Sequence, residues 1–153
     1  MKATKCTAKN TLSKNKLHIL GCVSPYPTKK DNCPGYFFKI NGINILLDCG
    51  FGVSKKLKFP KNYKNLHIFI SHFHKDHYSD IYAIAYASYV YNKLGILKER
   101  IKLYIPKTKV DNPEYVDYLL LKNLKESNRY NLFVIFSHFI YDFYCRFYFI
   151  SLF

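Results

Sequence analysis

The chain has 153 residues, of which 49% are hydrophobic, so one domain with a packed core is possible. Its formal net charge is +14, and residues 1–75 carry +12 of it, with fourteen Lys against two acids. Five cysteines, an odd number without a CxxC pair, exclude the framework of a disulfide-rich secreted domain and indicate a reducing, intracellular compartment. The charge predicts a polyanionic partner, with RNA or DNA first and an acidic membrane surface second, whereas a well-solvated Lys-rich surface is the alternative.

Residues 1–16 are basic and contain no acid. They lack the apolar core of a secretory signal, and we interpret them as a disordered basic tail. The alternative is a transit peptide that would direct the chain from the cytoplasm to an organelle. Residues 17–153 are then expected to form a single domain.

The apolar runs predict six strands and two longer helices. Asn41-Gly42 separates two such runs and predicts a two-residue hairpin. Ser79 is expected to cap a helix that Gly95 ends, and one or two helical turns are expected just before Pro60. The predicted strands are 17–21, 36–40, 43–47, 66–70, 101–105 and 131–136, the short helical turns are 53–59, and the helices are 80–94 and 112–127. This order indicates a mixed α/β fold.

The last 22 residues, 132–153, are strongly apolar, but His138, Asp142 and Arg146 lie near their middle. Asp and Arg at the centre of a membrane helix each cost about 2.5–3.5 kcal/mol. Buried strands are therefore favoured over a membrane anchor, and we expect no membrane span.

Four potential metal ligands lie within six residues, directly after the predicted strand 66–70. They form the pattern H-x-H-x-D-H with His72, His74, Asp76 and His77. Zinc takes about four nitrogen, oxygen or sulfur ligands close together, and α/β sheets place ligands beyond the carboxyl ends of their strands. A polar turn with hydrogen-bonded histidines is the alternative, but this spacing rarely arises by chance.

The motif resembles the metal-binding motif of the metallo-β-lactamase superfamily. Around it, residues 17–105 are similar to the amino-terminal half of the ribonuclease Z and phosphodiesterase branch. The similar segments include Cys33-Pro34-Gly35-Tyr36, residues 45–52 and Asp80-Ile81. The resemblance implies a metallo-β-lactamase-like αββα sandwich, of which this chain has only the first half.

The resemblance also implies two zinc ions, with Mn or Fe as other candidates, that activate water for hydrolysis. His72 and His74 would bind the first metal, and Asp76 and His77 the second, so that Asp76 also takes part in catalysis. Asp48 would orient these ligands from behind them. A structural role for Asp48, as a cap of the Gly-rich loop that follows it, is the alternative.

The family pattern requires ligands beyond these four. His138 follows the predicted strand 131–136 and is the candidate for the third His, although it could equally be a strand His satisfied by local hydrogen bonds. Asp142 is the one candidate for the bridging Asp, with a spacing that is too short, and no final His follows. We therefore expect a sandwich that is truncated to its first half.

The resemblance and the charge together predict a metal-dependent hydrolase of phosphodiesters. Within the family, the most natural expectation is a ribonuclease Z-like enzyme that processes tRNA 3′ ends. Five lysines before the metal strand could hold phosphates, or could simply form a solvated loop: Lys55, Lys56, Lys58, Lys61 and Lys64. Two other hypotheses stay open. The chain could be an inactive metal-binding half-domain, or a subunit completed by a second copy or another chain, or it could be a small-molecule hydrolase of the same fold.

Overall fold

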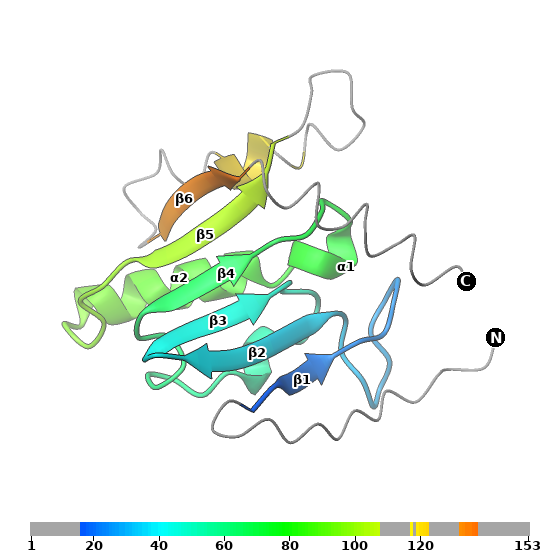
Figure 1. The fold of residues 1–153 in the computed structure, drawn as a ribbon, viewed down its shortest axis with the longest axis horizontal. Helices are drawn as coiled ribbons and strands as arrows, with labels where there is room; N and C mark the ends of the chain where they lie inside the picture. The colour runs from blue at the N-terminus through cyan, green and yellow to red at the C-terminus, as the bar shows by residue number, and fades with distance from the viewer. Residues whose placement is uncertain (1–15, 108–116, 118, 123–131, 138–153) are drawn as a thin grey trace.

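The computed structural model describes residues 16–107, 117, 119–122 and 132–137. Six strands form one sheet in the order β1-β2-β3-β4-β5-β6 (Figure 1). The strands are β1 His18–Gly21, β2 Gly35–Ile40, β3 Ile43–Leu47, β4 Leu66–Phe69, β5 Ile101–Pro106 and β6 Leu132–Ser137, and the helices are η1 Ser54–Lys56, α1 Lys75–Tyr78 and α2 Ile81–Lys93. The predicted mixed α/β class is confirmed, and every predicted strand is present to within one residue at each end.

Strand direction divides the sheet into two parts. Strands β1, β2 and β3 pair antiparallel, whereas β3, β4, β5 and β6 pair parallel. The four parallel strands therefore begin at one edge of the sheet and end at the opposite edge. We call these the amino edge and the carboxyl edge.

The hairpin between β2 and β3 has the predicted two-residue turn. Asn41 and Gly42 both have positive φ angles, 47° and 84°, which are the angles of a type I′ turn. Ile40 pairs directly with Ile43 across this turn. The turn sets the register that points alternate side chains of both strands toward the core.

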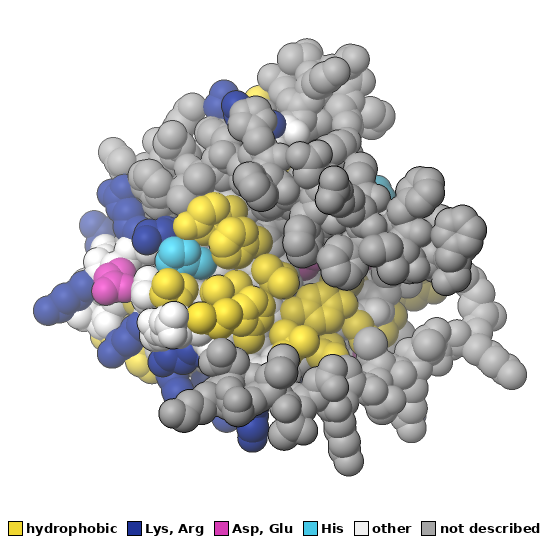
Figure 2. All heavy atoms as spheres, in the orientation of Figure 1, with side chains coloured by type: hydrophobic (Ala, Val, Ile, Leu, Met, Phe, Trp, Pro, Cys, Tyr) yellow, Lys and Arg dark blue, Asp and Glu magenta, His cyan; other side chains and the backbone are white. Residues whose placement is uncertain are grey.

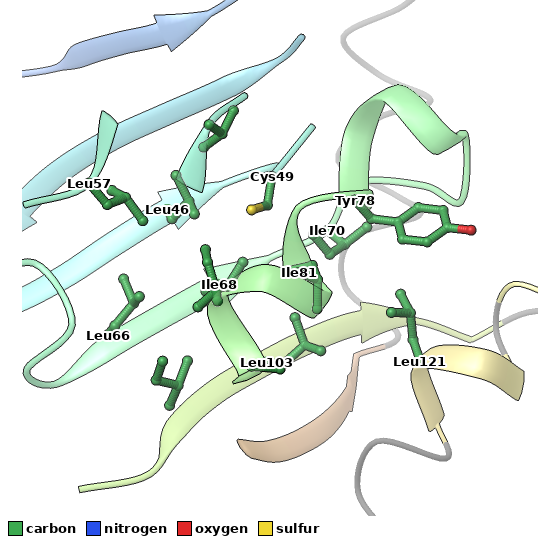
Figure 3. Packing of buried hydrophobic residues seen from close by; sticks show 14 of the residues in the cluster. Leu46, Cys49, Leu57, Leu66, Ile68, Ile70, Tyr78, Ile81, Leu103 and Leu121 are labelled. Atoms are coloured by element: carbon green, nitrogen blue, oxygen red, sulfur yellow. The ribbon is translucent and has the colours of Figure 1, made fainter. Parts of the chain in front are cut away.

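The core lies between the sheet and α2. Leu46, Ile68 and Leu103 are adjacent across β3, β4 and β5 and are fully buried. Ile81 and Ile84 of α2 belong to the same buried cluster, and Figure 3 shows Ile81 among the strand residues. Each of these side chains contributes about 1.5–3 kcal/mol through burial of apolar surface.

The opposite face of the sheet is more exposed and largely apolar. Figure 2 views the molecule from this side and shows a band of hydrophobic side chains across the strands. Leu47 and Phe69 lie side by side on it, and Tyr104 stacks on Phe69 with 4.2 Å between ring centroids. The αββα architecture that the sequence resembles buries this kind of face under a second sheet.

The helices differ from the prediction in three respects. Helix α2 begins one residue later than predicted, after Asp80 rather than after Ser79, so the prediction that Ser79 caps it is wrong. The Ser79 hydroxyl donates instead to the Lys75 carbonyl and closes α1, a short helix that was not predicted. Residues 53–59 contain only the 3₁₀ turn η1. The end of α2 is as predicted, because Gly95 leaves the helix with φ 72°.

Several predictions fall partly or wholly outside the described residues. Of the predicted helix 112–127, residues 117 and 119–122 are described and are helical. The predicted tail 1–16 lies outside them except for Lys16, as do residues 138–153 at the carboxyl end. Among the helices that are described, none is long and apolar enough to cross a membrane.

Replacement of Gly42 by Ala should destabilise the hairpin. The added Cβ would meet no atom within 4 Å, so the cost comes from the left-handed backbone alone. We expect a loss of about 1–2 kcal/mol in the free energy of unfolding, measured by urea denaturation. Gly42→Asn is the matched control and should lose less, because Asn adopts this conformation more readily. Equal losses in the two variants would contradict the assigned turn.

Candidate metal centre

The H-x-H-x-D-H motif lies at the carboxyl edge, where the chain leaves β4. Residues 72–74 are the link between the strand and α1, and His74 precedes α1 with an extended backbone, φ −68° and ψ 138°. Side chains two residues apart on an extended chain point the same way, which brings His72 and His74 together. Asp76 and His77 follow on the single turn of α1. The local backbone thus presents the four predicted ligands as two pairs.

The first pair consists of two imidazole nitrogens. His72 Nε2 lies 3.0 Å from His74 Nδ1, within hydrogen-bonding distance. Two nitrogens bound to one tetrahedral zinc at about 2.0–2.1 Å lie roughly 3.3 Å apart. A few tenths of an ångström of movement would therefore let the two nitrogens share one ion.

The second pair combines an imidazole and a carboxylate. His77 Nε2 lies 3.6 Å from Asp76 Oδ2, again close to the separation of two ligands on one ion. The two pairs are neighbours, since the ring centroids of His72 and His77 are 4.0 Å apart. The structure therefore brings all four predicted ligands into one small region.

Asp48 links the end of β3 to this region. Its carboxylate is buried and accepts hydrogen bonds from the Ser71 N–H at 2.8 Å and the Ser71 hydroxyl at 2.9 Å. The second oxygen also lies 2.8 Å from His77 Nδ1. Asp48 has φ 56°, a left-handed conformation that Asp tolerates and that is typical of residues held by their surroundings. These contacts place Asp48 directly behind the motif, and its orienting role stays a prediction.

Two serines that sequence analysis missed also contact the motif. Ser71 Oγ lies 2.9 Å from His72 Nδ1. Ser24, in the loop after β1, donates to Asp76 Oδ2 at 2.7 Å. Ser71 could have been noticed as the residue before the motif, but Ser24 lies 52 residues from its partner and no pattern in the sequence connects the two.

The Gly-rich loop after Asp48 packs directly on α1. A Cβ on Gly50 would lie 1.8 Å from the Asp76 carbonyl oxygen, so only glycine permits this approach. The Cys49 N–H donates to the His77 carbonyl at 2.7 Å, and the Asp80 N–H donates to the Cys49 carbonyl at 3.0 Å. Backbone contacts from this one loop therefore hold Asp76 and His77 in place.

The electrostatic environment favours neutral imidazole at His72. Burial, together with the nearby His77 and His74 rings, lowers the pKa of His72 to about 4, although Asp48 and Asp76 oppose the shift. Neutral imidazole is the form that binds metal ions. His72 is therefore in the ligand form at neutral pH.

A second network holds the other side of α1. The buried Tyr78 hydroxyl donates to Asp117 Oδ1 at 2.5 Å, and Lys75 Nζ donates to the Tyr78 oxygen at 2.7 Å and forms an ion pair with Asp117. Burial and the hydrogen bond to Asp117 raise the pKa of Tyr78 to about 12. Burial opposes ionisation of Asp117, but the hydrogen bonds from Lys75 and Tyr78 lower its pKa. The charges and hydrogen bonds together tie the motif to a segment almost 40 residues further along the chain.

The predicted lysine cluster divides between two regions. Lys55 and Lys56 belong to η1, which is held at the start of α2 because Ser54 donates to the Asp80 carboxylate through its N–H and its hydroxyl. The remaining three, Lys58, Lys61 and Lys64, lie in the segment that leads to the start of β4, at the amino edge. That edge is the one opposite the motif.

The metal centre is incomplete within the part of the chain that the structure describes. No three or more His, Cys, Asp or Glu side chains there are grouped closely enough to hold a metal ion. The predicted third ligand, His138, and Asp142 lie outside the described residues. The donor set therefore fits metal as two pairs of ligands, and each pair needs further ligands.

The fold is that of the metallo-β-lactamases. The structure of the metallo-β-lactamase fold protein YhfI from Bacillus subtilis matches 81% of this chain with a TM-score of 0.67 and 23% identity. The structure of human tRNase Z, short form, matches 82% with a TM-score of 0.51 and 20% identity. In both cases the chain covers 47% of the solved structure.

Sequence comparison gives the same result. The chain is 30% identical over 90 residues to a probable metallo-hydrolase, YhfI of Bacillus subtilis, and 40% identical over 68 residues to ribonuclease Z of Chlamydia pneumoniae. These alignments cover 58% and 43% of this chain, but only 37% and 22% of the relatives. No family model matches the chain. The resemblance to the metallo-β-lactamase superfamily, confined to its amino-terminal half, is confirmed.

Removal of the Tyr78 hydroxyl should destabilise the anchored motif. Tyr78→Phe keeps the buried ring but deletes the hydrogen bonds with Asp117 and Lys75, and we expect the free energy of unfolding to fall by about 1 kcal/mol in urea denaturation. Tyr86→Phe, which alters an exposed ring on α2, is the matched control and should change it by less than about 0.5 kcal/mol. A variant at Tyr78 as stable as this control would show that the network does not stabilise the fold.

Proposed function

We propose that the protein is a metal-dependent hydrolase of phosphodiesters with a dinuclear zinc centre, acting on RNA as a ribonuclease Z-like enzyme. The observation that carries the proposal is the arrangement of the four motif side chains as two ligand pairs, with separations of 3.0 Å and 3.6 Å between donor atoms. Zinc suits this mixture of imidazole and carboxylate, and Mn or Fe would also accept it.

Each residue of the centre has a distinct part in this proposal. His72 and His74 would hold one ion, and Asp76 and His77 the other. Bound zinc ions supply a nucleophilic water at neutral pH and stabilise the charge that develops on the phosphate. Asp48 keeps His77 Nδ1 engaged at 2.8 Å and thereby directs Nε2 toward Asp76. Ser24 holds one oxygen of the Asp76 carboxylate, which limits its rotation.

The choice of RNA as substrate has two supports. The chain carries a net charge of +14, which favours a polyanion, and relatives with 40% identity are named ribonuclease Z. Lys55 and Lys56, held beside the start of α2, are the lysines we propose for phosphate contacts. We place the reaction inside the cell, in the cytoplasm or an organelle, where the thiols of Cys33 and Cys49 stay reduced.

A second candidate follows from the ligands that the described residues provide. The chain spans less than half the length of the relatives and solved structures that it matches, and the described residues provide two ligand pairs without a complete site. The chain could therefore be completed by His138, by a second copy in a homodimer or by another chain, or it could be an inactive metal-binding half-domain. A small-molecule hydrolase of the same fold is a third candidate, which the basic charge does not favour.

Metal content tests the proposal directly. Purified wild-type chain should carry about two zinc ions per chain, measured by elemental analysis, if the site is complete in the protein as isolated. A His72→Ala, His74→Ala variant should lose at least one of them, because the first ligand pair is removed. The zinc-loaded wild type should hydrolyse a phosphodiester substrate, and the variant should not. This pair of results would support the enzymatic function.

The control for this experiment is His18→Ala, which removes an exposed imidazole of β1 and should keep the metal. Folding of each variant is checked by circular dichroism. A folded wild type without metal would contradict the enzyme proposal for this chain alone. Metal without hydrolysis would favour the half-domain or the completed subunit.

Asp48→Asn should weaken metal binding without removing a ligand. The amide would no longer hold His77 with a charged acceptor, and loss of such an outer contact typically lowers metal affinity about 10–100-fold. Competition with a zinc chelator measures this change. Asp31→Asn, at an exposed loop position, is the matched control and should leave the affinity unchanged. An Asp48 variant that binds zinc as tightly as wild type would exclude the orienting role.

A further inference from the structure

Basic side chains gather at the amino edge of the sheet, opposite the metal centre. They come from four places: the end of β2, the segment before β4, the end of α2, and the loop and first residues of β5. All eight are exposed: Lys39, Lys58, Lys61, Lys64, Lys93, Lys98, Arg100 and Lys102. We call this set the basic edge. Figure 2 shows dark blue Lys and Arg side chains along this side of the molecule, at the left of the view.

Strand register places Lys39 and Lys102 near the amino edge, one residue apart in level and on opposite faces of the sheet. Lys39 pairs with Asn44, Asn44 with Leu66, and His67 with Lys102. The Asn44 amide donates to the carbonyls of Lys61 and Lys64 at 3.0 and 2.8 Å, which holds the segment before β4 against the sheet. The segment that carries Lys61 and Lys64 is therefore held in place at the amino edge.

The acids do not neutralise this edge. Glu99 is the one acidic residue that the described part of the chain places there, against eight Lys and Arg, so the edge carries a net +7. The cations extend over three strand spacings, from β2 to β5, which is roughly 14 Å. This length matches several successive phosphates of one nucleic-acid strand, which recur about every 3.4 Å along a duplex.

The basic edge is separate from the metal centre. Strand β4 and Ile70 lie between Lys64 and the motif, a distance of roughly 16 Å at about 3.3 Å per residue. Phosphates bound at this edge could not be those that are cleaved. Contacts here would hold a polyanion without taking part in the reaction.

We propose that the basic edge binds the phosphate backbone of RNA as a tethering surface distinct from the metal centre. The proposal deepens the proposed function, on which its choice of RNA rests. The excess of cations over acids along this edge favours a phosphate backbone as the partner. Leu94, Ile96 and Ile40 are also exposed nearby, so the test includes a lipid surface as an outcome. Binding should be independent of base sequence, because phosphates are contacted in preference to base edges.

The test is RNA binding by the full chain in the absence of metal, followed by fluorescence anisotropy with a labelled single-stranded RNA of about 16 nucleotides. A Lys61→Gln, Lys64→Gln, Lys98→Gln variant removes three cations of the basic edge. We expect its affinity to fall about tenfold and the slope of log affinity against log salt to become shallower by about 2. Circular dichroism confirms that the variant folds.

A charge-matched control removes three cations elsewhere, as Lys29→Gln, Lys30→Gln, Lys107→Gln. Its affinity and salt slope should stay closer to those of wild type. Equal losses in the two triple variants would overturn the proposal, because net charge alone would then explain binding. Wild-type affinity in the basic-edge variant would also overturn it. A basic-edge variant that loses binding to anionic phospholipid vesicles but keeps RNA would overturn it in favour of a lipid surface.

Failure of RNA binding at the basic edge can be distinguished from failure of hydrolysis at the metal centre. The His72→Ala, His74→Ala variant should bind the RNA as wild type does, because the basic edge lies at the other end of the strands. Loss of binding in that variant would place RNA at the metal centre and overturn a separate surface. A failure to hydrolyse RNA would leave the binding measurement unaffected.

Discussion

The candidate centre depends on the carboxylate of Asp48. This group lies at the end of β3, and it accepts the Ser71 N–H and hydroxyl and contacts His77 Nδ1. It therefore joins the end of one strand, the exit of the next and the helical turn that carries two ligands. A buried carboxylate is stable only when such partners surround it, so the same contacts that orient His77 also satisfy the buried oxygens of Asp48.

The backbone around this carboxylate is equally constrained. Gly50 brings the loop after β3 so close to Asp76 that no side chain fits between them. Hydrogen bonds from Cys49 to His77 and from Asp80 to Cys49 then fasten the carboxyl end of α1 to the loop. A four-residue helix has little stability of its own. Its position comes from these neighbours and, on the other side, from Tyr78 and Asp117.

The parallel strands give the molecule two chemically different edges. Their carboxyl ends carry the imidazoles and carboxylates, and their amino ends carry the row of cations. The two sets are separated by the length of a strand. In our proposals, hydrolysis takes place at the carboxyl edge and the polyanion is held at the amino edge. The apolar face between them is the one that a second layer would cover in the αββα architecture.

Local sequence predicted the strands, the hairpin turn and the clustering of the four motif side chains, because periodicity, Asn-Gly turns and residue spacing are properties of neighbouring residues. The role of these four side chains as metal ligands stays a prediction. Local sequence did not determine the start of α2, since Asp80 is held by Ser54, 26 residues away, through a contact that local propensity does not contain. Nor could it find Ser24 or Asp117, which meet the motif only after residues 52 and 39 positions apart in the chain are brought together. The division of the lysines between η1 and the amino edge was decided in the same way. Five lysines that are close in sequence separate because strand direction, a property of the assembled sheet, sends the segment before β4 away from the metal centre.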